Sequence, residues 1–280
     1  MFYRFLFICN FLISMSLGVN AQSELTMKND MMYADVVLSH NGKTHKISSM
    51  IDTGCSYCLI DSTYAVDSCN IVMTGDYGSG VTASGQRINS FYVDIDSVCF
   101  GGIVFPKIHC FVADLAGKFK HYAPKFLIGA DVLKRELWKF DLKQNKMTLC
   151  KNPVKNVKYT IKWKDNYYGR KFINNIWFDC KVDGKKTRVH FDSGSRRNWL
   201  PIEMGISQTT TIVSERADLA NSLRLDTIGV AENTPVSFSN YHVNLDFSLE
   251  ATCLPRINTE FLWGKSFVLD YRKSRLYILE

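Results

Sequence analysis

The chain has little that would build long helices or span a membrane beyond its first residues. No long uninterrupted apolar run follows the N-terminal one, and helical periodicity is scarce. The motifs G-x-S-x-G and H-E-x-x-H are absent, so serine-hydrolase and zinc-protease mechanisms of those types have no support. Asn-x-Ser/Thr sequons are also absent, which favours a bacterial exported protein over a eukaryotic secreted one.

Positive charge is in modest excess. The chain has 34 Lys and Arg against 27 Asp and Glu, which gives a formal net charge of +7. The lysines are scattered over turns and strand faces rather than gathered along one helix, and this is typical of solvated surface. We therefore expect no nucleic-acid partner.

Residues 1–21 have the pattern of a signal peptide. Arg4 is their only charge, an apolar run covers 5–13, and residues 19–21 (Val-Asn-Ala) have the small-residue pattern of a cleavage site. The apolar run is too short for a membrane span. We expect cleavage near Ala21, export to the periplasm or the extracellular medium, and no stable membrane anchor afterwards. The first β-like run begins near Tyr33, which leaves too few residues for a pro-segment that covers a cleft.

The cysteines permit several interpretations. Nine are present, and the eight after residue 21 form an even set that allows disulfides, although sequence does not give their pairing. Cys55 and Cys58 form a C-x-x-C pair. A zinc site would need a second close pair of ligands, and a thioredoxin-like site would need βαβ flanks. Neither is present, so we expect buried thiols or a local bridge, with no metal and no cofactor.

Two short runs carry the strongest chemical signal. Residues 51–54 read Ile-Asp-Thr-Gly and residues 191–194 read Phe-Asp-Ser-Gly, each after a turn and a β-like run. Two such acid loops in one chain can bring their carboxylates together about a pseudo-two-fold axis. Two carboxyl groups that share one proton can activate water for peptide hydrolysis.

Further landmarks recur in the same order in both halves of the chain. Residues 127–129 (Leu-Ile-Gly) are echoed by 262–264 (Leu-Trp-Gly), and an apolar residue with an aspartate follows at 140–141 and at 269–270. After the predicted signal peptide at 1–21, the repeat predicts two lobes, 22–152 and 153–280. Strands are expected at 33–38, 46–51, 91–100, 108–112, 146–149, 159–163, 176–182, 188–191, 243–247 and 275–279, and short helices at 62–66, 129–134 and 217–223.

On these runs the chain resembles the two-lobed pepsin/retropepsin group of aspartic proteases. Residues 192–201 resemble the D-T-G-S-x-x-x-W-[VL]-P run of pepsin-like enzymes, whereas 52–61 and 127–129 are more like retroviral-type and bacterial single-lobe relatives. The resemblance covers nearly all of the mature chain. It implies an all-β, bilobal pepsin-like acid protease fold, with the cleft between two duplicated lobes and no cofactor.

The resemblance also implies roles for the acid loops. One aspartate from each loop would form the catalytic dyad, the hydroxyl residues would interlock the loops, and the glycine amides would donate hydrogen bonds to the carboxylates. The expected catalytic residues are Asp52 and Asp192, and the expected supporting residues are Thr53, Gly54, Ser193, Gly194 and Ser195.

The residue after each loop glycine is expected to make the dyad asymmetric. Ser195 fits the hydroxyl that the family places beside the outer carboxylate oxygen. Cys55 departs from the pattern, because a thiol is a weak donor. The loss of a strong donor from Asp52 predicts an activity optimum of about pH 5–7.

A glycine-bearing hairpin at 77–85 is the candidate flap. Residues 77–80 resemble the pepsin flap Y-G-T-G, and residues 81–85 resemble the flap of bacterial retropepsin-like proteins. The candidate substrate contacts are Tyr77, Ser84 and Gly85, and the second half has no clear flap motif. His190 is expected to face away from Asp192, and Trp199 and Trp263 are expected to pack beside the acid loops.

These observations predict an exported aspartic endopeptidase that hydrolyses peptide bonds through a water activated by the aspartate dyad. Its partner would be a peptide or protein substrate, bound extended in the cleft, and the protein would be a monomer. The alternative is a catalytically weak or inactive module of the same fold that binds peptides or proteins in the cell envelope. Cys55 and the missing second flap are the reasons to keep that alternative.

Overall fold

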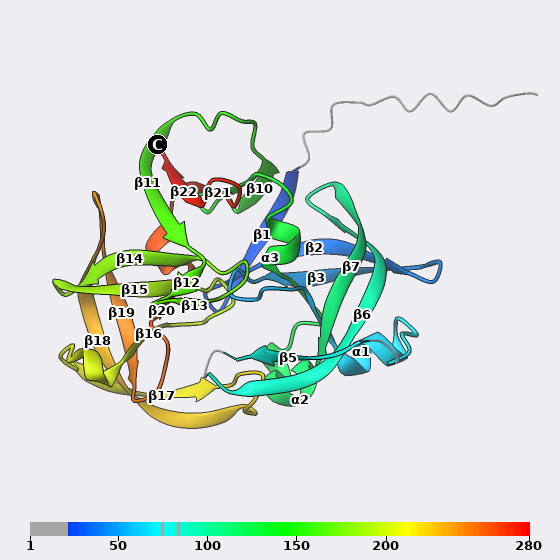
Figure 1. The fold of residues 1–280 in the computed structure, drawn as a ribbon, viewed down its shortest axis with the longest axis horizontal. Coiled ribbons are helices and arrows are strands. Elements are labelled where there is room, and N and C mark those ends of the chain that lie inside the picture. The colour runs from blue at the N-terminus through cyan, green and yellow to red at the C-terminus, as the bar shows by residue number, and fades with distance from the viewer. Residues whose placement is uncertain (1–21, 74–75, 83–84) are drawn as a thin grey trace, which may run out of the picture.

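The computed structural model describes residues 22–73, 76–82 and 85–280, which fold mainly into β-strands (Figure 1). The predicted signal peptide and Ser84 lie outside the described residues. Within those ranges, no helix is long and apolar enough to cross a membrane.

Strands from the first half of the chain surround the first acid loop. Strand β3 runs directly into Asp52, and β8 lies parallel to β3. Strand β4 lies antiparallel to β8 and parallel to β7. The strands of this half are β1 (Gln22–Lys28), β2 (Met31–His40), β3 (Lys43–Ile51), β4 (Leu59–Asp61), β5 (Tyr77–Val81), β6 (Arg87–Phe100), β7 (Ile103–Ala113) and β8 (Phe126–Ile128).

The second half repeats this set of pairings around the second acid loop. Strand β15 runs into Asp192, and β20 lies parallel to β15. Strand β16 lies antiparallel to β20 and parallel to β19. The strands are β14 (Trp177–Val182), β15 (Lys185–Phe191), β16 (Asn198–Pro201), β17 (Thr210–Arg216), β18 (Arg224–Phe238), β19 (Tyr241–Glu250) and β20 (Arg256–Ile257), with the small hairpin β12 (Asn166–Tyr167) and β13 (Arg170–Lys171) beside them.

The pairings correct one part of the predicted repeat. The Asp52 amide donates to the Ile128 carbonyl at 2.9 Å, and the Asp192 amide donates to the Ile257 carbonyl at 2.9 Å. The counterpart of 127–129 is therefore 256–258, and the alignment with 262–264 is wrong. Residues 262–264 instead lie at the end of a short helical turn and lead into the next strand. The same sequence pattern, an apolar pair before glycine, therefore occurs in two different structures.

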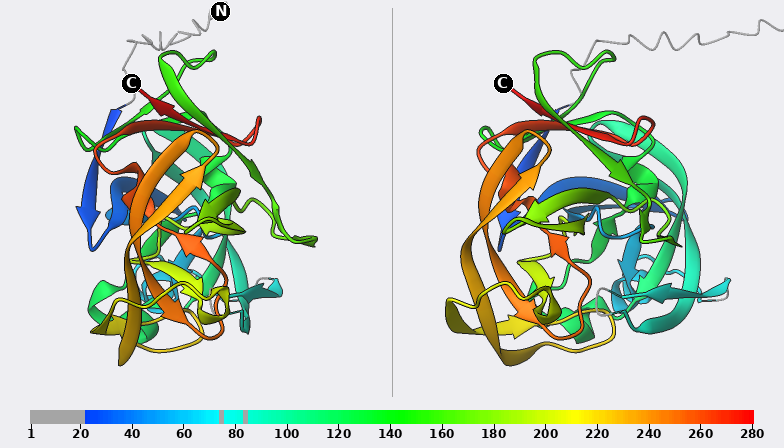
Figure 2. Two further views of the ribbon diagram at one scale, coloured as in Figure 1. Left: turned by 90° about the vertical axis from the view of Figure 1, so that its left-hand side faces the viewer. Right: turned by 60° about the vertical axis from the view of Figure 1, so that its left-hand side comes forward.

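A sheet of strands from both halves joins the two halves at the top of Figure 1, and it lies at the top in both views of Figure 2 as well. Strand β9 pairs antiparallel with β21, and Phe140 lies opposite Phe267 with ring centroids 5.0 Å apart. Strand β1 also belongs to this sheet, so the fold begins earlier than the expected run near Tyr33. The remaining strands are β9 (Trp138–Asp141), β10 (Lys146–Leu149), β11 (Val157–Lys164), β21 (Ser266–Asp270) and β22 (Arg275–Leu279).

The sequence prediction of strands was more successful than that of helices. All ten predicted runs fall in strands, apart from one residue at the start of β14. Helices α1 (Ser62–Asp67) and α3 (Ala130–Leu133) confirm two predicted helices, but 217–223 is a loop. The missed elements are α2 (Leu115–Phe119) and the helical turns η1 (Lys120–Tyr122), η2 (Ile202–Met204) and η3 (Thr259–Leu262).

The predicted boundary between lobes falls between β10 and β11. Residues 150–156 form neither helix nor strand there. Since β9 and β10 share a sheet with β11, β21 and β22, the chain crosses this segment without leaving the sheet. The division at 152 stays a prediction.

Candidate active site

The two acid loops meet at the centre of the molecule with their carboxylates facing one another. A Cβ atom added to Gly54 would lie 2.6 Å from Asp192 Oδ1, and one added to Gly194 would lie 2.5 Å from Asp52 Oδ2. Any larger residue would push the opposite carboxylate away. Glycine is therefore required in both loops because of close approach, and each loop closes over the carboxylate of the other.

Reciprocal hydrogen bonds lock the two loops together. The Thr53 amide donates to Ser193 Oγ at 3.0 Å, and the Ser193 amide donates to Thr53 Oγ1 at 3.0 Å. Each hydroxyl then donates to a carbonyl of the opposite strand, Thr53 to Phe191 at 2.9 Å and Ser193 to Ile51 at 2.7 Å. Both side chains are fully buried, so the network has no competition from water.

Asp52 accepts three hydrogen bonds from its own loop. The amides of Gly54 and Cys55 donate to Oδ1 at 2.8 and 3.2 Å, and the Cys55 thiol donates to Oδ2 at 3.1 Å. Burial and, second, the charge of Asp192 raise the pKa of Asp52 to about 7, against the opposing effect of these donors. Asp52 is therefore suited to hold a proton at neutral pH.

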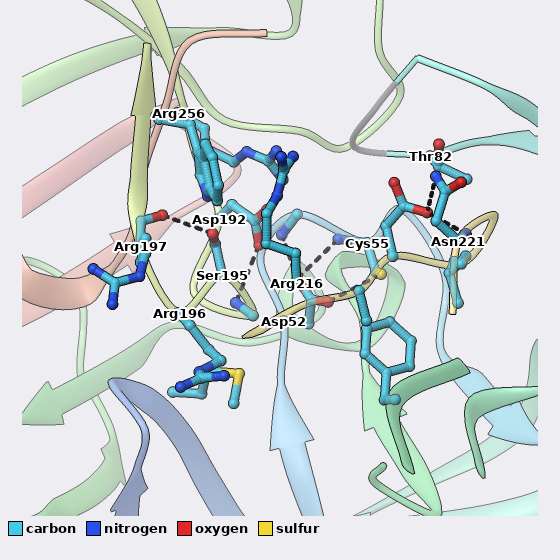
Figure 3. A pocket seen from close by; sticks show the side chains of 18 of the residues that line it. Asp52, Cys55, Thr82, Asp192, Ser195, Arg196, Arg197, Arg216, Asn221 and Arg256 are labelled. Carbon is cyan, nitrogen blue, oxygen red and sulfur yellow. Dashed lines mark hydrogen bonds and ion pairs between the residues drawn. The ribbon is translucent and has the colours of Figure 1, made fainter. Parts of the chain in front are cut away.

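Asp192 has a different environment, which Figure 3 shows. The Gly194 amide donates to Oδ1 at 3.1 Å, and Arg256 Nη1 lies 3.5 Å from Oδ2. The expectation for Ser195 is wrong, because its hydroxyl donates to the Arg197 carbonyl at 2.7 Å instead of to the carboxylate. A guanidinium group thus stands beside Asp192, while a thiol stands beside Asp52. The dyad is asymmetric, but not in the way the sequence suggested.

A cavity of about 480 Å³ lies over the two carboxylates and is lined by both halves. The wall beside Asp52 is apolar, whereas the wall beside Asp192 combines aromatic rings with arginines. The apolar wall consists of Met31, Met50, Leu59, Leu115, Phe119 and Leu127, and the opposite wall consists of Trp177, His190, Trp199, Arg216 and Arg256. The two sides of the dyad therefore offer chemically different surfaces.

His190 lies on the cavity side of β15, contrary to the prediction. It lines the cavity, and its ring stacks on Trp177 with centroids 4.8 Å apart. Residues two apart in a strand share a face, so His190 and Asp192 point to the same side. Burial is the main reason that the pKa of His190 is lowered to about 4. It is therefore a neutral wall residue at the pH where Asp52 titrates.

The hairpin of β5 and β6 reaches the cavity through residues other than the predicted Tyr77 and Gly85. Tyr77 is 65% exposed and packs against Phe91 with ring centroids 5.1 Å apart. Gly85 lies in the turn with a φ of +80° and does not line the cavity. Val81, Thr82 and Gln86 line it instead. Tyr77 and Val81 share one face of β5, but only the end of the hairpin that carries Val81 reaches the cavity. The hairpin was therefore placed correctly, and its contact residues were not.

A second hairpin, which the sequence analysis missed, covers the cavity from the other half. Strands β17 and β18 pair along their length, and the loop 217–223 between them lines the cavity. The Leu223 amide donates to the Lys118 carbonyl at 2.8 Å, so the loop touches α2 of the first half. Residues 210–216 read two polar, two apolar and three polar residues in succession, so they gave no clear strand signal. The loop that follows them was interpreted as a helix.

Trp199 and Trp263 also differ from one another in position. Trp199 lines the cavity beside the second acid loop as expected. Trp263 is 48% exposed and follows η3, so the expectation that it packs beside an acid loop is wrong.

All eight described cysteines are free thiols. Cys55 donates to Asp52, and Cys58 Sγ accepts from the Gly129 amide at 3.4 Å. Among the described residues, no group of three or more His, Cys, Asp or Glu side chains could hold a metal ion. The C-x-x-C pair therefore supports the first acid loop from within rather than forming a separate centre.

Comparison with known proteins supports an aspartic protease-like protein. The aspartyl protease family model matches residues 36–132, a segment that runs from β2 to α3 and includes Asp52. No curated protein matches the chain. Asp192 lies outside the matched segment, so its role depends on the geometry described above.

Proposed function

We propose that the protein is an exported aspartic endopeptidase with a dyad formed by Asp52 and Asp192. The observation that carries this proposal is the mutual contact of the two acid loops, in which each loop glycine lies against the opposite carboxylate. The reciprocal hydrogen bonds of Thr53 and Ser193 hold that arrangement rigidly. Rigid, buried carboxylates that share a proton suit general acid and base catalysis on a peptide bond.

The surroundings of the carboxylates support a different role for each. Arg256 stabilises negative charge on Asp192, and the raised pKa of Asp52 keeps the proton there. Asp192 would take a proton from a water as that water attacks the scissile carbonyl, while Asp52 protonates the carbonyl oxygen. Asp192 then passes its proton to the amide nitrogen and Asp52 recovers its own, so the C–N bond breaks and both groups return to their starting states.

The substrate would lie extended between the two hairpins. Backbone pairing with a hairpin strand would orient it, as in other strand-addition complexes. The apolar wall beside Asp52 would take a large apolar side chain. In this proposal residues 22–152 and 153–280 are two lobes related by a pseudo-two-fold axis, and the protein is an exported monomer that needs no cofactor.

The proposal is tested by incubating the protein that begins at Gln22 with a diverse peptide library from about pH 3 to about pH 8. We expect internal cleavage that either Asp52→Asn or Asp192→Asn reduces by at least about a hundredfold. Asp35→Asn is the matched control, because Asp35 pairs with Lys46 at the surface. Cleavage that survives either dyad substitution would overturn the assignment. Activity only after N-terminal trimming would contradict the expectation that no processing step is needed.

One observation favours the non-catalytic alternative. Arg256 pairs with one of the two carboxylates. In the alternative, this contact makes Asp192 too weak a base to activate water, and the site only binds peptides. A peptide-binding module would retain peptides unchanged, and its Asp52→Asn/Asp192→Asn double variant would bind them as well as the wild type. Lost binding in the double variant, or any turnover by the wild type, would count against it.

A further inference from the structure

Arg256 occupies a position where the first half of the chain has an apolar residue. Strand β20 places Arg256 beside His190 and Ile257 beside Phe191. Strand β8 places Leu127 beside Met50 and Ile128 beside Ile51. Arg256 is therefore the counterpart of Leu127. Leu127 contributes to the apolar wall beside Asp52, whereas Arg256 puts a cation into the corresponding wall beside Asp192.

The guanidinium group of Arg256 has donors left over. Its side chain is 12% exposed, and its one ion-pair contact is the 3.5 Å approach of Nη1 to Asp192. Its Nε is buried and has no hydrogen-bond partner among the described residues. A guanidinium has five N–H donors in a planar fork, and the contact with Asp192 uses one of them.

Most other arginines of the cavity are already paired. Arg216 contacts Glu250 at 2.6 Å and Asp226 at 3.3 Å, and Arg224 contacts Asp226 at 3.0 Å. These four side chains carry two positive and two negative charges, so the network is neutral as a whole.

The two remaining arginines of the cavity wall, Arg196 and Arg197, have contacts of their own. Arg196 lies 4.0 Å from Glu215 and over the Tyr122 ring. Arg197 donates from Nε to Ser214. Figure 3 shows Arg216 and Arg256 reaching toward the same space beside Asp192, where both lie near the Trp199 ring, at 4.6 and 5.9 Å from its centroid.

We propose that Arg256 forms a subsite for a substrate carboxylate next to the scissile bond. The protein then prefers peptides with Asp or Glu on the Asp192 side of the bond and a large apolar residue on the Asp52 side. This inference rests on the proposed function, which it extends from a class of reaction to a class of substrate.

The chemistry of the wall supports a carboxylate over other side chains. A carboxylate can accept two parallel hydrogen bonds from a guanidinium fork. A lysine side chain would be repelled by Arg256, and an apolar side chain would leave the buried donor unpaired. Arg256 also lies beside Asp192, so the added carboxylate meets a cation as well as the two aspartates.

The test compares peptides that differ at one residue beside an apolar–X bond, where X is Glu, Gln, Leu or Lys. We expect kcat/KM for Glu to exceed that for Gln by roughly tenfold to a hundredfold, since hydrogen bonds to charged groups are worth that much. Arg256→Leu, which copies the residue of the first half, should abolish the preference, and Arg256→Lys should keep part of it. Arg224→Gln is the control for loss of a paired arginine and should leave the preference intact.

A binding measurement separates this inference from the proposed function. Dissociation constants of the same peptides are measured with the Asp52→Asn protein, in which Arg256 and Asp192 are unchanged. Tighter binding of the Glu than of the Gln peptide supports the carboxylate subsite even if no peptide is cleaved. Tighter Glu binding together with no cleavage overturns only the proposed function. Equal binding of both peptides, or an equal preference in Arg256→Leu, overturns the inference.

A second arm distinguishes the two sources of a peptide carboxylate. Each Glu peptide is also tested in a short form that ends at the X position, with either a free or an amidated C-terminus. A preference carried by the side chain survives amidation. A preference that amidation removes assigns the subsite to a C-terminal carboxylate. Thermal melting of each Arg256 variant confirms that it is folded under the conditions of the assay.

Discussion

Cys55 and Ser195 occupy the same position after the two loop glycines, yet only the thiol reaches a carboxylate. Cys55 Sγ lies 3.1 Å from Asp52 Oδ2, whereas the Ser195 hydroxyl turns back to the Arg197 carbonyl. Next to Asp192 the charge of Arg256 takes the place of that hydroxyl. The two carboxylates therefore have different neighbours, a thiol at Asp52 and a guanidinium at Asp192.

Substitutions of Cys55 should move the alkaline limb of the pH profile of kcat/KM, to lower or higher pH according to how well the new side chain donates to Asp52. In Cys55→Ser the hydroxyl is the stronger donor to ionised Asp52, so the pKa of Asp52 falls and the limb moves to lower pH. In Cys55→Ala the donor is lost and the limb moves to higher pH. A hydrogen bond to a charged group is worth about 1.5–3 kcal/mol, so each shift should be at most about one to two pH units. Limbs that coincide in all three proteins would show that the thiol does not influence the dyad.

The pH dependence of stability offers a test that needs no substrate. The pKa of Asp52 is raised to about 7, chiefly by burial, so folding favours its protonated form. The associated stability is complete below the ordinary carboxyl pKa and is lost as pH rises through about 7. From about pH 4 to pH 7, the unfolding free energy of Asp52→Asn should rise relative to the wild type, by at most about 1.4 kcal/mol per pH unit. Denaturant unfolding at several pH values measures this difference, and a constant difference would contradict it.

At the scale of elements, two hairpins from opposite halves close over the cavity. The loop 217–223 of the second hairpin is held by Asp218, whose Oδ1 accepts from the amides of Ala220 and Asn221 at 2.8 and 2.7 Å. Lys118 Nζ donates to the Ala220 carbonyl at 3.2 Å and ties the loop to the first half. Leu219 also packs against the buried apolar cluster of the first half, so a few polar contacts and one apolar side chain hold the loop.

Asp218→Ala should loosen this loop without disturbing the dyad. Asp218 Oδ1 also accepts from Asn221 Nδ2 at 3.0 Å. Loss of these three hydrogen bonds should speed amide hydrogen exchange at Ala220 and Asn221 several-fold, because local opening then costs less free energy. Since the loop lines the cavity, KM for a cleaved peptide should rise while kcat changes little. Asp218→Asn keeps an acceptor oxygen and should behave like the wild type. Exchange rates that do not change in Asp218→Ala would show that the loop is held by other contacts.

At the scale of the whole molecule, the sheet formed by β9, β10, β11, β21 and β22 should make the two halves unfold as one cooperative unit. Strands β9 and β21 pair across the halves, with Phe140 and Phe267 stacked between them. The reciprocal bonds of Thr53 and Ser193 form a second connection at the dyad. Because both connections cross the chain's midpoint, we expect a single unfolding transition rather than two.

Phe267→Ala tests the connection through the sheet. Loss of this fully buried ring should cost about 3–5 kcal/mol of unfolding free energy. A double-mutant cycle with Phe140→Ala should give a coupling of at least about 0.5 kcal/mol. Phe178→Ala is the matched control, since Phe178 packs in the core of the second half, and it should add independently to Phe140→Ala. Coupling of equal size in both cycles, or two separate transitions, would contradict this role of the sheet.

The sequence by itself determined the strand class and the two acid loops. Alternating apolar runs have the two-residue period of strands, and Asp-Thr-Gly and Asp-Ser-Gly carry a local requirement for a close backbone approach that can be read without a partner. The same local reading failed where two structures share one pattern. Leu262-Trp263-Gly264 was matched to 127–129, although it ends a helical turn.

Only the tertiary structure decided what surrounds each carboxylate. Arg256 comes next to Asp192 through the register of β20, a strand of two residues that no periodicity could reveal. The reach of loop 217–223 to Lys118 likewise depends on a contact between segments far apart in the chain. The sequence gives the chemistry of each side chain. Its partners depend on contacts between segments far apart along the chain, and those contacts form only when the chain folds.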